Sequence, residues 1–112
     1  MANARVRRGR RTQNVCVPCW LRDHGWHDAI GVAASLPGKD ILNTPGHAIE
    51  VKARFDFNPQ AWLRQATRNA KPDERPCVIV RMAGQGEDAS EYLIFRRLAD
   101  DELAMGPQHD ER

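Results

Sequence analysis

The spacing of apolar residues predicts a helix near the start of the chain. Pro18 lacks a backbone N–H and is best tolerated in a first turn, so we expect the regular helix to begin near Asn14 or to bend there. Gly25 is a stop signal, which gives about three turns. The apolar residues at helical spacing are Val15, Cys16, Cys19, Trp20 and Leu21.

Three short extended segments follow this helix. Residues 29–34 are small and mostly apolar, residues 40–42 form a short apolar stretch, and residues 48–53 alternate apolar with charged side chains. Pro37-Gly38 and Pro45-Gly46 lie between them and are typical of turns. We therefore expect three successive strands.

The second half of the chain predicts a helix and two further strands. Asn58 is a suitable N-cap and Pro59 a suitable first-turn residue for a helix that runs to about residue 70. Residues 77–80 are a continuous apolar run typical of a strand buried on both faces, and residues 92–95 form a fifth strand. The apolar face of the helix consists of Trp62, Leu63, Ala66 and Ala70.

The predicted order is α-β-β-β-α-β-β, which favours an α/β fold with a mixed sheet flanked by helices. With 112 residues, 41% hydrophobic and 29% charged, the chain has the length and composition of one globular domain. We divide it into a basic N-terminal arm (1–11), a domain (12–98) and an acidic tail that we expect to be disordered (99–112).

Charge is distributed unevenly, although the net charge is only +2. Five acids and one base lie in residues 100–112, whereas the first eleven residues contain no acid. A basic block of this kind attracts polyphosphates through counterion release, and it is also compatible with a solvated tail. The basic block consists of Arg5, Arg7, Arg8, Arg10 and Arg11.

No apolar run approaches the roughly 20 residues that span a bilayer, and no apolar stretch follows the basic residues to form a signal peptide. These features predict a cytoplasmic protein with no membrane partner.

The three cysteines, Cys16, Cys19 and Cys77, are an odd number and favour reduced thiols over a disulfide framework. Cys16, Cys19, His24 and His27 could in principle bind zinc. The gap between the cysteine pair and the histidine pair is much shorter than in a zinc finger. Buried thiols on a helix are therefore the favoured interpretation.

The residues most suggestive of chemistry are Asp40, Glu50 and Lys52. Glu50 and Lys52 are two apart on a predicted strand, so their side chains leave the same face of the sheet. The turn at residues 44–46 folds the preceding strand back and can bring Asp40 within reach of Glu50.

Two converging carboxylates repel each other unless a cation lies between them, and hard oxygen ligands suit Mg²⁺ or Mn²⁺. With Lys52 beside them, they could support metal-assisted hydrolysis of a phosphodiester. The same three residues could instead form a charged strand face with a cross-strand ion pair.

The sequence resembles the PD-(D/E)XK nuclease superfamily, and within it the archaeal-type Holliday junction resolvases and similar proteins encoded by bacteriophages. The resemblance covers residues 8–98. The matching positions are Arg8-Gly9-Arg10-Arg11-Thr12, Ser35, Asp40, Ala48-Ile49-Glu50-Val51-Lys52-Ala53 and Trp62-Leu63-Arg64-Gln65.

This resemblance implies a restriction-endonuclease-like fold, a homodimer, Mg²⁺ dependence and paired nicks across a four-way DNA junction in a bacterial or phage-infected cell. It implies that Asp40, Glu50 and the Val51 carbonyl hold the metal and that Lys52 is the catalytic lysine. A dimer also matches the near two-fold symmetry of a junction. The residues implied to contact phosphates are Arg7, Arg8, Arg10, Arg11 and Arg54.

One position departs from the family pattern. Resolvases of this type carry a glutamate on the first helix, where this chain has Gln13, and a neutral amide is a poorer Mg²⁺ ligand than a carboxylate. Gln65 could assist the site, and Ser35 could contact phosphate or serve as a turn hydroxyl. Two alternatives to the nuclease therefore remain: a nuclease-fold protein that binds branched or duplex DNA with weak or no cleavage, and a small zinc-binding regulator.

Overall fold

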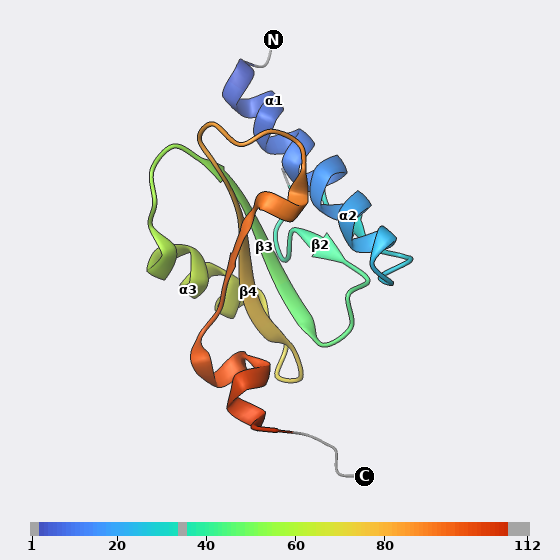
Figure 1. Cartoon of the computed structure of the whole chain (residues 1–112), viewed down its shortest axis with the longest axis vertical. Coiled ribbons are helices and arrows are strands. Elements are labelled where there is room, and N and C mark those ends of the chain that lie inside the picture. The colour runs from blue at the N-terminus through green and yellow to red at the C-terminus, as the bar shows by residue number, and fades with distance from the viewer. Residues whose placement is uncertain (1–2, 34–35, 108–112) are drawn as a thin grey trace.

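The computed structural model describes residues 3–33 and 36–107 (Figure 1). Its α-helices are α1 (Ala4–Arg11), α2 (Val17–Asp23) and α3 (Pro59–Asn69). Its strands are β1 (Ile30–Gly31), β2 (Ile41–Leu42), β3 (His47–Arg54), β4 (Arg75–Met82) and β5 (Leu93–Phe95). The predicted α/β class and mixed sheet are confirmed.

The first helical region begins at Ala4, so a start near Asn14 is wrong, but the helix is irregular at Asn14, where the alternative prediction placed a bend. The Asn3 side chain caps α1 by accepting a hydrogen bond from the Val6 N–H at 2.9 Å. A π-helical turn, Thr12–Cys16, then joins α1 to α2, and it ends just before Pro18. Proline cannot donate the helical hydrogen bond, which explains why the irregularity lies there.

The five strands form two sheets, whereas the sequence pattern predicted a single one. β3 and β4 are parallel, with Ile49 opposite Cys77, and α3 connects them. β5 pairs antiparallel with β4, which gives the order β3-β4-β5. β1 and β2 pair only with each other, over two residues each, so the predicted strand at 29–34 is wrong in extent.

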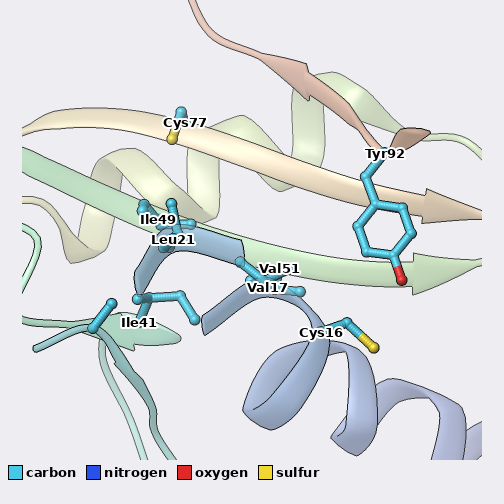
Figure 2. Packing of buried hydrophobic residues seen from close by; sticks show 9 residues of the cluster. Cys16, Val17, Leu21, Ile41, Ile49, Val51, Cys77 and Tyr92 are labelled. Carbon is cyan, nitrogen blue, oxygen red and sulfur yellow. The ribbon is translucent and has the colours of Figure 1, made fainter. Parts of the chain in front are cut away.

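The three-stranded sheet has an apolar layer on each face. On one face, Ile49, Val51 and Cys77 pack with residues of α2 and with Tyr92 (Figure 2). On the other face, Val78 and Val80 pack against α3. The prediction that residues 77–80 are buried on both faces is confirmed, since β4 lies in the middle of this sheet.

The two ends of the chain are helical over much of their described length. The predicted basic arm is mostly helix α1, whose residues are largely exposed. The predicted disordered tail begins at residue 99, but two short 3₁₀ helices, Leu98–Asp100 and Glu102–Met105, cover most of residues 98–107. Residues 108–112 of the predicted tail lie outside the described residues.

Within the described part of the chain, none of the helices combines the length and apolar character needed to cross a membrane.

Candidate functional site

Asp40 is held against the free edge of β3 by two hydrogen bonds. Its backbone N–H donates to the Ile49 carbonyl at 3.1 Å, and its Oδ2 accepts from the Val51 N–H at 2.8 Å. The N–H and C=O of one strand residue point to the same side of the strand, so the Val51 carbonyl shares this edge with the carboxylate. The predicted approach of Asp40 to Glu50 is therefore present.

Glu50, Lys52 and Gln65 form a polar cluster between β3 and α3. The Lys52 Nζ lies 3.3 Å from Glu50 Oε2 and donates to Gln65 Oε1 at 3.0 Å. Glu50 is only 3% exposed, and the Lys52 side chain is 12% exposed. The alternation of β3 explains the arrangement, because Ile49 and Val51 point into the core on the other face.

Burial dominates the protonation of the two acids. Burial and, after it, the negative charge of Asp40 raise the pKa of Glu50 to about 7, although Lys52 opposes this rise. Burial also raises the pKa of Asp40, while the hydrogen bond from the Val51 N–H and a hydrogen bond from Glu50 counter the rise. Near neutral pH the pair can therefore share a proton that a cation could replace.

The donor set fits a divalent cation. The Glu50 Oε1 atom is buried and accepts no hydrogen bond, which is costly for an ionised carboxylate unless another ligand approaches this oxygen. Asp40 and the Val51 carbonyl supply further hard oxygen ligands of the kind that Mg²⁺ and Mn²⁺ prefer. No three His, Cys, Asp or Glu side chains gather into a metal-binding group within residues 3–33 and 36–107, so the carbonyl would be an important ligand.

The predicted accessory residues have different outcomes. Gln65 joins the site as the acceptor for Lys52. Gln13 lies in the π-helical turn and donates through Nε2 to the Val32 carbonyl at 2.6 Å. Val32 in turn donates its N–H to the Asp40 carbonyl at 2.9 Å, so Gln13 supports the segment that carries Asp40. Ser35 lies outside the described residues.

The arginines implied to meet phosphates occupy different environments. Arg8 is half-buried and donates to the Met82 carbonyl, which ties α1 to the end of β4. Arg11 forms an exposed ion pair with Glu87. Arg54 lies over the Trp62 ring, with its Cζ 6.0 Å from the ring centroid. Arg7 and Arg10 are exposed on α1.

Sequence reasoning missed a small basic pocket at the end of β3. Arg5, Arg8 and Arg54 line it together with Phe55, and its volume is about 250 Å³. Arg5 belongs to the basic block but has no counterpart in the resemblance. No local sequence signal locates the pocket, because Arg5 and Arg8 belong to α1, whereas Phe55 follows the last residue of β3, Arg54.

The cysteines and histidines at the start of the chain do not converge. Cys16 is buried as predicted, but Cys19 is exposed and its Sγ accepts a hydrogen bond from Arg22 at 3.2 Å. His24 stacks on Trp20, with the ring centroids 3.8 Å apart. These contacts offer no support for a zinc site in this part of the described chain.

Comparisons with family models, with curated proteins and with solved structures found no match to this chain. The resemblance to PD-(D/E)XK nucleases therefore stays a prediction from the sequence motifs.

Proposed function

We propose that this protein is a metal-dependent endonuclease that cleaves phosphodiester bonds in branched DNA, as Holliday junction resolvases do. The observation that carries the proposal is the buried Oε1 of Glu50, which accepts no hydrogen bond and lies in a cluster with Asp40 and Lys52. A merely structural ion pair would gain from satisfying both carboxylate oxygens, whereas a metal ligand keeps one available.

Each residue of the cluster has a chemical task in this proposal. Asp40, Glu50 and the Val51 carbonyl would hold Mg²⁺ or Mn²⁺. When bound, such an ion polarises a phosphoryl oxygen and acidifies a water molecule. Lys52, positioned by Gln65, would hold the attacking water or stabilise the charge that develops on the phosphate.

The DNA partner and the homodimer also belong to this proposal. Five arginines precede the site in the sequence, and exposed guanidinium groups on α1 supply the charge that a DNA backbone attracts. Two incisions at a nearly two-fold symmetric junction require two active sites, so a dimer with a two-fold axis is expected. Light scattering at working concentration tests the dimer, and a monomer that still makes paired cuts would contradict it.

The activity is tested by incubating a labelled four-way junction, a flap and a plain duplex with the protein and Mg²⁺. We expect cleavage that is lost in Asp40→Asn and in Lys52→Ala. Asp73→Asn and Lys71→Ala are matched controls, because these side chains are exposed and remote in sequence from the cluster. Cutting that survives both site substitutions would overturn the site, and the three substrates would rank the preferred DNA structure.

A second candidate is a protein of the same fold that binds branched or duplex DNA with little or no cleavage. The observation that favours it is Gln13, whose amide donates to the Val32 carbonyl where the resemblance would place a metal-binding glutamate. Junction binding without cleavage in either Mg²⁺ or Mn²⁺ would support this candidate over the nuclease.

A further inference from the structure

The pocket at the end of β3 combines an exposed aromatic ring with several guanidinium groups. Phe55 is 56% exposed, and the Cζ of Arg5 lies 4.5 Å from its ring centroid, with that of Arg8 at 5.7 Å. Arg54 also lines the pocket, and Asp56 is the one carboxylate among the described lining residues. The pocket is therefore basic and is lined in part by an exposed aromatic ring.

We propose that this pocket binds an unpaired nucleotide of the DNA substrate, with its base stacked on Phe55 and its phosphate held by Arg5 and Arg54. Proteins that bind single strands combine aromatic stacking surfaces with a cationic groove, because every base has a π face and every nucleotide a phosphate. This inference deepens the proposed function, on which it rests, by naming an unpaired nucleotide of the DNA substrate as the recognised feature.

The electrostatics of Arg8 support an anionic occupant. Burial and the positive charge of Arg81 lower the pKa of Arg8, so an added negative charge nearby would be favourable. Arg8 Nη2 donates to the Met82 carbonyl, whereas the buried Nη1 has no hydrogen-bond partner. A small shift of this side chain would allow an oxygen that enters the pocket to satisfy that donor.

Size and position favour a single base over a duplex segment. The pocket volume of about 250 Å³ lies below the roughly 300–1,000 Å³ of sites for drug-sized ligands. Phe55 follows Lys52 by three residues, so the two lie at most roughly 10 Å apart along the backbone. Bases in an intact duplex hide their faces by stacking on each other, so the ring of Phe55 would contribute only where a strand is unpaired.

The test measures DNA binding by fluorescence anisotropy in EDTA, so that its result does not depend on cleavage. The probes are a fork with two thymidine arms, the same fork with abasic arms, and a blunt duplex. We expect the wild-type protein to bind the thymidine fork about 10-fold more tightly than the abasic fork, and Phe55→Ala to abolish that difference. Phe55→Trp should retain it, because the stacking surface remains.

Phe57→Ala is the matched control. Phe57 is 53% exposed on the same segment, but its ring contacts Trp62 and Phe95 and does not line the pocket. We expect this variant to keep the preference for the thymidine fork. Phe55→Leu, which keeps apolar bulk without a ring, replaces Phe55→Ala if the latter does not fold.

Arg5→Gln separates the phosphate contact from stacking. We expect it to weaken binding to both forks by a similar factor and to reduce the slope of log affinity against log salt by about one, whereas Phe55→Ala should leave the slope unchanged. Equal wild-type affinity for the thymidine and abasic forks would overturn the inference, as would a Phe55→Ala effect of equal size on the blunt duplex. Preference for the thymidine fork over the abasic fork without any cleavage would overturn only the proposed nuclease activity. Cleavage without this preference would overturn only this inference.

Discussion

Asp40 accepts a hydrogen bond from the Val51 N–H at 2.8 Å, across eleven residues of chain. Val51 lies on the edge of the three-stranded sheet, where its N–H has no neighbouring strand to donate to. The Asp40 carboxylate takes that role, and the bond fixes one of its oxygens beside the Val51 carbonyl. The same contact therefore satisfies the sheet edge and positions the carboxylate for a cation.

Substitutions at Asp40 should separate these two roles. Asp40→Asn keeps an oxygen acceptor for the Val51 N–H, whereas Asp40→Ala leaves that donor without its partner and should lower the free energy of unfolding by about 1–3 kcal/mol. Both variants should lose cleavage, because both lack the charge that holds a divalent cation. Urea unfolding in EDTA and junction cleavage in Mg²⁺ measure the two effects, and equal stability of the two variants would contradict the structural role.

The Glu50 carboxyl should make the metal-free protein less stable as the pH rises. Its pKa is raised from 4.5 to about 7 in the folded chain, so the folded state binds more protons than the unfolded state between these values. The free energy of unfolding should therefore fall from about pH 4.5 to about pH 7, by about 3 kcal/mol.

Glu50→Gln should remove this part of the pH dependence, because a neutral amide can still donate to Asp40 and accept from Lys52. The free energy of unfolding is measured with urea in EDTA at several pH values from 5 to 8 for the variant and the wild type. Taking the difference between the two proteins cancels the contribution of other titrating groups such as His47. Mg²⁺ should flatten the wild-type profile and leave that of the variant less changed. Parallel profiles for the two proteins in EDTA would show that Glu50 titrates normally.

The order of strands and helices was predictable, because apolar residues recur every second residue in a half-buried strand and about every 3.6 residues in a half-buried helix. The buried run at 77–80 and the helix that follows Asn58 are examples. The length of the first helix was not predictable, because Arg-rich α1 has no buried residue and so lacks an apolar stripe. The separation of β1 and β2 into their own sheet depends on tertiary contacts that a short sequence window does not contain.

The candidate site was predictable as far as local geometry determines it. The two-residue spacing of Glu50 and Lys52 and the turn at 44–46 were enough to place Asp40, Glu50 and Lys52 together. The hydrogen bond from Gln13 to Val32 and the pocket around Phe55 were not predictable, because each depends on how α1 and the π-helical turn pack on the sheet.

Gln13→Glu tests whether Gln13 is a structural residue or a weakened metal ligand. In the wild-type protein, Gln13 Nε2 donates to the Val32 carbonyl at 2.6 Å, and a carboxylate at this position cannot donate. The free energy of unfolding should therefore fall by about 1–3 kcal/mol. Gln60→Glu, in the exposed first turn of α3, is the matched control and should be neutral or slightly stabilising. A gain in Mg²⁺ affinity without loss of stability, read by calorimetry and urea unfolding, would instead assign Gln13 to the metal site.

Gly31→Ala should disturb the same support from the opposite side. A Cβ at position 31 would lie 2.4 Å from Asn14 Oδ1 and 2.5 Å from the Gln13 carbonyl oxygen, so β1 or the π-helical turn would have to shift. We expect the free energy of unfolding to fall by about 1–3 kcal/mol. We also expect weaker Mg²⁺ binding, because the neighbouring residue Val32 donates its backbone N–H to the Asp40 carbonyl and so helps to position Asp40. Gly86→Ala is the control, since a Cβ there meets no atom within 4 Å, and it should change stability by less than about 0.5 kcal/mol. Equal stability of the two variants by urea unfolding would show that the close approach of β1 to the π-helical turn is not required.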